Sequence, residues 1–306
     1  MDGLGFEDGG GVLPELVPLA GGHSGETFLA RSAGERSVVR IYAGRGATRG
    51  PNAAETDAAV LRLVRGLVPV PEVLEVRRAD DSAGTPALLV TSWLEGTRLD
   101  EVLPSADDTL AETIGRNLGR ILARLAQMPM LRAGMFLDGE LRIGPWPAGA
   151  DDLTEWVATY GRAGPLGEWN EDDRAALEAL AEKAQEVVDR TDRACLVHSD
   201  FNPKNVLVDP STGEVTGLLD WEFAHAGSPF TDLGNLLRFE HRPVFSGAVL
   251  STYSDLVVDA PEDLLDRARA ADLFALVELA SRAEQTPVAI AAEDLLRTIV
   301  RHGYPE

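Results

Sequence analysis

A short polar segment between two apolar runs constrains the fold of this chain more than any other feature. The segment His198–Asn205 reads His-Ser-Asp-Phe-Asn-Pro-Lys-Asn. Leu196-Val197 precede it and Val206–Val208 follow it, so the pattern predicts a polar loop anchored between two buried strands. A further apolar run, Val215–Leu219, ends at Asp220 and predicts a second short strand after the loop.

Composition narrows the classes of function. The chain has 306 residues, 44% of them hydrophobic and 25% charged, which is typical of a globular protein large enough for two lobes. A formal net charge of -22 disfavours a nucleic-acid partner and would attract a cationic ligand, although surface charge that serves solubility explains the same value. We find no membrane-length apolar run, no secretory-signal layout and a single cysteine, Cys195, so we expect a cytoplasmic protein with no membrane partner.

Secondary-structure patterns change near residue 96. Before it, strand-type runs predominate, with a hairpin at 27–42, a helix after Pro51, and strands near 73–77 and 87–93. After it, helical periodicity is found at 109–128, preceded by a cap at Asp107 or Asp108, and at 172–192 and 261–302. We therefore expect an α+β fold with two lobes, 12–95 and 96–306, and a ligand bound at the hinge that joins them.

The polar segment has the spacing that phosphoryl transfer requires. Asp200 lies two residues after His198 and Asn205 five residues later, as in the catalytic loops of kinases. This reaction needs a carboxylate that orients the incoming hydroxyl and accepts its proton, and oxygen ligands for Mg²⁺. Asp200 suits the first role, and Asn205 and Asp220 suit the second. A single aspartate after a strand is more often a turn residue. The prediction therefore depends on the joint occurrence, in the right order, of His198, Asp200, Asn205, Asp220 and Asp232.

Three other residues are expected to support this site. His198 is predicted to organise the loop by hydrogen bonding rather than to transfer protons. Asp232 is predicted to open a helix and to brace the loop through its backbone. Glu222 would contact the metal-binding groups indirectly or face the substrate.

Together these residues resemble the aminoglycoside phosphotransferase family, the antibiotic and small-molecule branch of the protein-kinase-like fold. The resemblance is specific from Leu196 to Gly234 and diffuse over the rest of the chain. It implies a bilobal α+β fold in which residues 12–95 bind ATP or GTP and residues 96–306 carry catalysis and the substrate. It also implies that Asp200 is the catalytic base and that Asn205 and Asp220 bind Mg²⁺.

The first lobe departs from the kinase pattern. Kinases place a lysine on the third strand, but no lysine precedes Lys183. We expect Arg40 to hold the donor phosphates in its place, paired with Glu55 of the next helix, because a guanidinium grips phosphate bidentately. A surface arginine on a strand edge is the alternative.

Two further segments are expected to contact the nucleotide. The turn 20–26 lacks the usual glycine spacing, but Ser24 and Gly25 can still present a hydroxyl and backbone N–H groups to phosphate. An ordinary hairpin turn explains it nearly as well. Backbone groups at Ser92 and Leu94 are expected to pair with the nucleotide base. For Trp93, a contact to the base and packing in the core explain the residue equally well.

The acceptor is the least constrained part of the prediction. In the acidic segment 151–193, Asp151, Asp152 and Glu155 would line a pocket for a cationic antibiotic, such as an aminoglycoside or a basic peptide, although a solvated helix face is equally typical of such runs. Trp146, Trp156 and Trp169 leave a macrolide acceptor open.

Other functions remain open at this stage. One is a metabolic kinase for choline, homoserine or a sugar. Another is an inactive nucleotide-binding regulator, against which the intact Asp200, Asn205 and Asp220 argue. Protein kinase activity is disfavoured because the Asp-Phe-Gly and Ala-Pro-Glu elements are missing.

Overall fold

The computed structural model describes residues 15–19, 26–32, 34–43, 49–80, 82–240, 242–282 and 286–305. These residues form two compact units. The first unit contains the described residues up to Leu63, with Pro71–Leu94 and Asp138–Glu140, and the second contains Val64–Val70, Glu95–Leu137 and Leu141 onwards.

The first unit is built on an antiparallel sheet with the strand order β1-β2-β3-β5-β4. Its elements are β1 (Glu15–Pro18), β2 (Glu26–Ser32), β3 (Glu35–Tyr42), α1 (Ala53–Val64), β4 (Val73–Arg77) and β5 (Ala87–Ser92). The predicted hairpin is confirmed as β2 and β3, whose register closes at Ser32 and Glu35 around Gly34, with φ of +85°. The predicted helix is confirmed as α1, which buries Ala54, Ala58, Leu61 and Val64 at helical spacing.

The second unit combines helices with two small sheets. It contains β6 (Thr97–Arg98), α2 (Leu99–Val102), α3 (Asp108–Ala126), β7 (Pro129–Met130), β8 (Gly134–Phe136), β9 (Ile143–Gly144), α4 (Leu153–Tyr160), α5 (Glu171–Val188), β10 (Ala194–Val197), β11 (Val206–Val208), β12 (Val215–Leu218), β13 (His225–Gly227), α6 (Thr231–Leu237), α7 (Pro243–Leu256), α8 (Leu264–Ala280) and α9 (Pro287–His302). The sheets have the orders β7-β10-β13-β8-β9 and β12-β11-β6.

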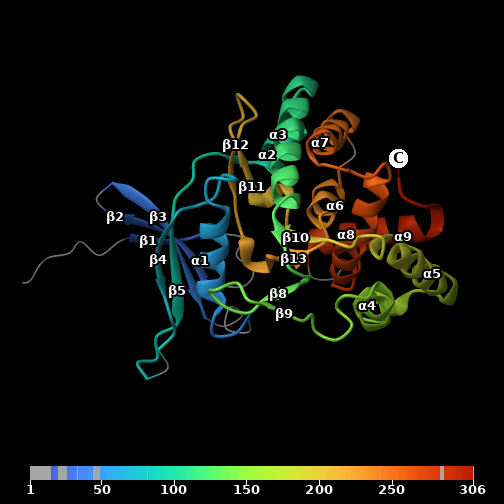
Figure 1. Ribbon diagram of the computed structural model, residues 1–306, viewed down its shortest axis with the longest axis horizontal. Coiled ribbons are helices and arrows are strands. Elements are labelled where there is room, and N and C mark those ends of the chain that lie inside the picture. The colour runs from blue at the N-terminus through green and yellow to red at the C-terminus, as the bar shows by residue number, and fades with distance from the viewer. Residues whose placement is uncertain are drawn as a thin grey trace, which may run out of the picture. The chain divides into compact units, whose positions relative to one another are not determined.

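Close helix packing forms the core of the second unit. Helices α3 and α7 lie side by side (Figure 1), and Gly119 lies so close to α7 that a Cβ atom there would be 2.7 Å from the carbonyl oxygen of Val249. Asp107 rather than Asp108 caps α3, since its carboxylate accepts the Leu110 amide at 2.8 Å. Helices α4, α5, α8 and α9 enclose a second group of buried side chains.

The predicted helical stretch 261–302 is two helices rather than one. The second, α9, begins at Pro287, and the hydroxyl of Thr286 caps it by accepting the Ala289 amide at 3.1 Å. A threonine followed by proline favours a helix start, because proline fits the first helical position and cannot continue a preceding helix.

Strand β10 contains the single cysteine of the chain. Cys195 is only 1% exposed, and burial raises the pKa of its thiol to about 12. Within the described part of the chain, we find no helix with the length and apolar character to cross a bilayer.

Candidate active site

The polar segment 198–205 connects β10 to β11 within the second unit, as predicted. Val197 and Val206 at its two ends are fully buried, so the loop is anchored on both sides. The backbone of the loop is also bonded to the chain that follows β12, since the Leu219 amide donates to the Asn205 carbonyl at 2.8 Å. This places the loop beside Asp220, which comes next in the chain.

His198 is a buried, neutral member of this loop. Its Nδ1 accepts the Asp200 amide at 3.2 Å, which leaves Nε2–H to donate to the Leu219 carbonyl at 2.8 Å. Burial lowers the pKa of His198 to about 4. The ring also packs against Trp221, with centroids 4.6 Å apart. These contacts hold the loop to the segment after β12, and a fully neutral imidazole is poorly suited to take up a proton.

Asp232, in the first turn of α6, lies beneath the loop. One carboxylate oxygen accepts the His198 amide and the other accepts the Ser199 amide, both at 2.8 Å. Ser199 has φ of +70°, a left-handed conformation that is costly for a residue other than glycine. Burial raises the pKa of Asp232 to about 7 against the lowering effect of those two hydrogen bonds. The carboxylate therefore holds a strained turn in place.

The carboxylate of Asp200 is held by two side-chain amides. Nδ2 of Asn202 donates to Oδ1 at 2.6 Å, and Nδ2 of Asn205 donates to Oδ2 at 2.7 Å. Burial and the charge of Asp220 raise the pKa of Asp200, while the bonds from Asn205 and Asn202 lower it. The group is thus fixed in orientation and more basic than a surface aspartate.

Asn205 and Asp220 present oxygen atoms suited to a hard cation. Because Nδ2 of Asn205 is bonded to Asp200, its Oδ1 lies on the opposite side of the amide. Asp220, two residues after the last residue of β12, adopts φ of 62° and ψ of 61°, which turns the chain sharply beyond the strand. One amide oxygen and one carboxylate, with the remaining positions left to water and phosphate, match the way proteins bind Mg²⁺. Among the described residues no group of three or more His, Cys, Asp or Glu side chains is gathered for a metal.

Those residues predicted to bind the nucleotide that the structure describes lie in the first unit. Arg40 is on β3, which lies between β2 and β5 rather than at an edge of the sheet. Glu55 is in the first turn of α1 as predicted, but its carboxylate pairs with Arg78, a contact that the sequence did not indicate. Ser24 and Gly25 lie outside the described residues.

The contact predicted at Ser92 and Leu94 is partly occupied. The Ser92 amide donates to the Glu72 carbonyl at 2.8 Å, and its hydroxyl accepts the Glu72 amide at 2.9 Å. The amide and the hydroxyl of Ser92 therefore already have partners within the first unit. A contact to a base would fall on other backbone groups near Leu94.

The acidic residues predicted to bind the acceptor have other surroundings. Asp152 caps α4 by accepting the amides of Thr154 and Glu155, and Asp151 and Glu155 are exposed to solvent. Glu222 is buried at 6% exposure. None of these four residues lines the cavity found in this segment.

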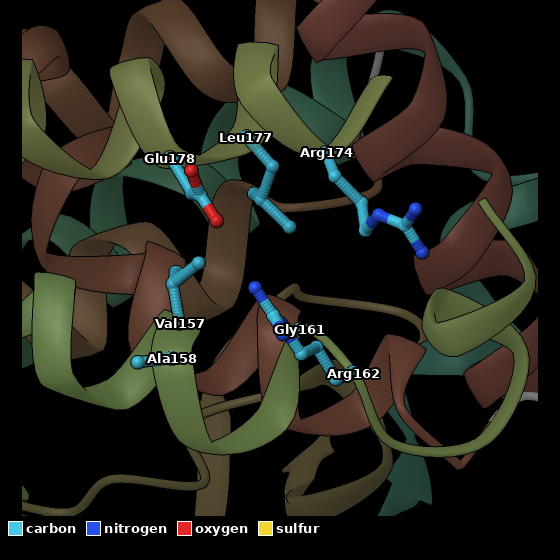
Figure 2. A pocket seen from close by; sticks show the side chains of 7 residues that line it. All are labelled: Val157, Ala158, Gly161, Arg162, Arg174, Leu177 and Glu178. Carbon is cyan, nitrogen blue, oxygen red and sulfur yellow. The ribbon is translucent and has the colours of Figure 1, made fainter. Parts of the chain in front are cut away.

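That cavity has a volume of about 190 Å³ and lies between α4 and α5. Its charged lining consists of Arg162, Arg174 and Glu178 around the apolar Leu177 (Figure 2). Two arginines and one glutamate do not match the acidic pocket expected from the sequence.

The tryptophans considered for a macrolide pocket are packed against the protein. Trp156 donates to the Phe274 carbonyl at 2.8 Å, and Trp169, only 3% exposed, donates to Glu293 at 2.7 Å. Trp146 packs edge-on against His225, with ring centroids 4.8 Å apart. All three side chains have contacts within the protein, and a macrolide acceptor stays a prediction.

One side chain of the site was missed from the sequence. Asn202 both bonds Asp200 and accepts the Lys204 amide at 2.9 Å, which starts the short turn Pro203–Asn205. An asparagine followed by proline is a helix-start signal that could have identified it.

The sequence matches the model of the phosphotransferase enzyme family over residues 15–291. The chain belongs to this family. It is therefore a kinase-type phosphotransferase with the α+β, protein-kinase-like fold that the sequence predicted.

Curated relatives of this phosphotransferase are much longer proteins. Acyl-CoA dehydrogenase family member 10 of Mus musculus is 26% identical over 220 residues, which is 72% of this chain and 20% of the relative. Acyl-CoA dehydrogenase family member 11 of Mus musculus is 40% identical over 55 residues, 18% of this chain and 7% of the relative. The chain thus spans a fifth or less of these relatives.

Solved structures share the fold at low identity. A thermostable mutant of aminoglycoside phosphotransferase APH(4)-Ia, in a ternary complex with ADP and hygromycin B, has a TM-score of 0.68 and 19% identity, and the match covers 95% of each chain. The GDP complex of aminoglycoside 2'-phosphotransferase-IIIa has a TM-score of 0.68 and 16% identity, covering 95% of this chain and 94% of that one.

Proposed function

We propose that this phosphotransferase moves the γ-phosphoryl group of ATP or GTP to a hydroxyl group of a small molecule. The observation that carries the proposal is the geometry around Asp200. A carboxylate fixed by two amides, made more basic by burial, and adjacent to the oxygen ligands Asn205 and Asp220 is the arrangement that phosphoryl transfer needs.

In this proposal Asp200 is the catalytic base. Each of its oxygens accepts one amide hydrogen bond, and the remaining lone pairs can receive the proton of the incoming hydroxyl. As the new O–P bond forms, the bond from the γ-phosphorus to the bridging oxygen breaks, the proton passes to Asp200, and the nucleoside diphosphate leaves. Asp232 and His198 keep the loop in position but take no part in the proton transfer.

We propose that Asn205 and Asp220 hold Mg²⁺, which when bound would neutralise charge on the phosphates. Arg40, on a central strand, is proposed to hold the donor phosphates, and Glu55 to support it. Ser24 and Gly25 are proposed to add hydrogen bonds to phosphate, and backbone groups near Leu94 to contact the base. The solved structures with the same fold carry ADP, AMP-PNP or GDP, which supports a nucleotide donor of either type.

The first candidate acceptor is a cationic antibiotic. The formal net charge of -22 and the hygromycin B in the related structures support it, and phosphorylation would then confer resistance in the cytoplasm. Asp151 and Glu155, exposed and without a structural role as helix caps, are the acidic groups available for such a ligand. Asp152 would contribute less, because capping occupies one oxygen of its carboxylate.

The second candidate is a metabolic small-molecule kinase. Two observations favour it: the curated relatives are named for acyl-CoA dehydrogenases rather than for antibiotics, and the cavity between α4 and α5, whose charged lining is Arg162, Arg174 and Glu178, is not an acidic pocket. A hydroxylated acyl thioester therefore belongs in the acceptor screen beside choline, homoserine and sugars.

Replacing Asp200 by alanine tests the base. We expect transfer to fall below detection while nucleotide binding, measured by calorimetry with AMP-PNP and Mg²⁺, stays within about threefold of wild type. Asp189→Ala, which removes an exposed carboxylate from the end of α5, is the matched control. Retained turnover in Asp200→Ala would refute the assignment.

Acceptor identity is tested by nucleotide consumption with aminoglycosides, basic peptide antibiotics, macrolides and the metabolites above. Turnover with antibiotics alone would support the first candidate, and turnover with metabolites alone would support the second. Nucleotide binding without any consumption, with or without an acceptor, would indicate the inactive regulator instead.

A further inference from the structure

Helix α6 is a short buried helix bonded on one side to the catalytic loop. It has 7 residues, and its Asp232 carries the amides of His198 and Ser199. Because both bonds are made to the backbone of the loop and Ser199 has a strained conformation, a small displacement of α6 would move the turn that precedes Asp200. What fixes α6 therefore also fixes the loop.

The other contact of α6 is a buried ionic cluster with α8. Asp272 of α8 accepts two hydrogen bonds from Arg238, at 2.8 and 2.6 Å, and one from Nδ2 of Asn235 at 2.8 Å. Asp272 and Asn235 are 5% and 4% exposed, and the side chain of Arg238 is 8% exposed. All three side chains lie in the second unit with the catalytic loop.

The backbones of the two helices also meet closely here. A Cβ atom at Gly234 would lie 2.2 Å from the Ala268 carbonyl oxygen and 2.7 Å from Cβ of Asp272. Glycine is therefore the residue that allows α6 to approach α8 at this point. Asn235, which follows Gly234, and Arg238, directly after the end of α6, bond Asp272 beside this contact.

Stability alone explains this cluster poorly. Burying an ion pair often contributes little net stability, because desolvation offsets the attraction between the charges. Oδ1 of Asn235 is in addition buried and has no hydrogen-bond partner among the described residues, which is unfavourable. The cluster instead fixes one position of α6 relative to α8. The bidentate ion pair and the oriented amide set both the distance between the two helices and the rotation of α6.

We propose that Asp272, acting through Asn235 and Arg238, is a positioning residue for the catalytic loop. The path runs from α8 to α6 by this cluster, and from α6 to His198 and Ser199 by Asp232. The proposal rests on the proposed function, in which the loop carries the base, and it adds a group on a distant helix to the requirements for activity.

The test compares Asp272→Asn with Glu293→Gln as the matched control. Glu293 is also a largely buried carboxylate that links two elements, because it accepts from Trp169 and Arg297, but it has no bond to α6. Two quantities are measured on the full chain. One is kcat and KM for ATP with Mg²⁺, followed as ATP hydrolysis without an acceptor, and the other is amide hydrogen exchange of the peptide covering 198–202.

For Asp272→Asn we expect kcat to fall about ten- to a hundredfold with KM changed less than about twofold, because misplacement of a catalytic group lowers kcat more than binding. Exchange of the 198–202 peptide should accelerate about tenfold or more as the two amides loosen from Asp232. Arg238→Lys, which retains the charge but not the fork, should give a smaller loss of kcat than Arg238→Gln. Glu293→Gln should lower the melting temperature while kcat and loop exchange stay at wild-type values.

If Asp272→Asn does not fold, Asn235→Ala takes its place, since it removes one hydrogen bond and keeps the ion pair. Loss of stability with unchanged kcat and unchanged loop exchange would overturn the positioning role. Absence of turnover in the wild type with ATP and with GTP, both without an acceptor and with every acceptor screened above, would instead refute the proposed function. The exchange measurement would still decide whether α8 holds the loop.

Discussion

Replacing Asp232 by asparagine would separate the cost of burying this carboxylate from its benefit to the loop. The carboxylate accepts two backbone amides, each at 2.8 Å. Asparagine has the same shape but only one acceptor oxygen, so one of the two amides would lose its partner. An unsatisfied buried amide costs about 1–3 kcal/mol.

The opposing contribution depends on pH. Burial raises the pKa of Asp232 from 3.8 to about 7, so the folded protein binds this proton more tightly than the unfolded chain does. The stabilisation is therefore full below pH 3.8 and is lost as the pH rises through 7. Between pH 5 and pH 8.5, this linkage removes about 3 kcal/mol from the free energy of unfolding of the wild type. Asparagine does not titrate and escapes this loss.

We therefore expect Asp232→Asn to be less stable than wild type at pH 5 and equally or more stable at pH 8.5, while kcat is reduced at both. Urea denaturation at the two pH values measures the difference in unfolding free energy. Asp107→Asn, which replaces a surface carboxylate that caps α3, is the control and should show no such crossover. A difference between Asp232→Asn and wild type that is the same at both pH values would refute the reasoning.

Three further predictions concern packing, protonation and nucleotide binding. Gly119→Ala should lower the unfolding free energy by about 1–3 kcal/mol, because the new Cβ would lie 2.7 Å from the Val249 carbonyl, whereas Gly247→Ala meets no atom within 4 Å and should not destabilise. Because the pKa of His198 is lowered from 6.5 to about 4, the unfolded chain binds this proton more tightly, and the free energy of unfolding falls by about 2 kcal/mol from pH 7 to pH 5. His198→Asn should remove this loss, which unfolding curves at the two pH values check. Arg40→Gln should raise KM for the nucleotide about tenfold and Arg40→Lys less, and equal KM values in steady-state assays would contradict the phosphate contact.

Most of the fold could be predicted because its elements have clear local patterns. The hairpin of β2 and β3, the strands β4 and β5, and α1 and α3 all lie where periodicity placed them. Helix α7 was missed, because its apolar residues surround most of the helix and give no one-sided stripe. The short strands β6 to β9 have 2 or 3 residues and form through pairing with distant segments, which local sequence does not encode.

The part of the candidate site that could be predicted consists of residues at a characteristic spacing along the chain. Loop residues such as Asp200 and Asn205 are close in sequence, and Asp232 was expected to brace the loop, as its bonds to His198 and Ser199 show. The cluster around Asp272 could not be foreseen, since it joins residues 34 and 37 positions apart through helix packing. Likewise the roles of the acidic residues depend on which carboxylates are already used as caps or ion pairs.

The burial of Cys195 has a practical consequence for experiments on this enzyme. A thiol that is 1% exposed, with a pKa near 12, stays protonated and out of reach of alkylating reagents at neutral pH. Because it is the single cysteine of the chain, a second one introduced on the surface would be the sole site of covalent labelling. A fluorophore or spin label can thus be attached at one chosen position without first removing a native cysteine from the core.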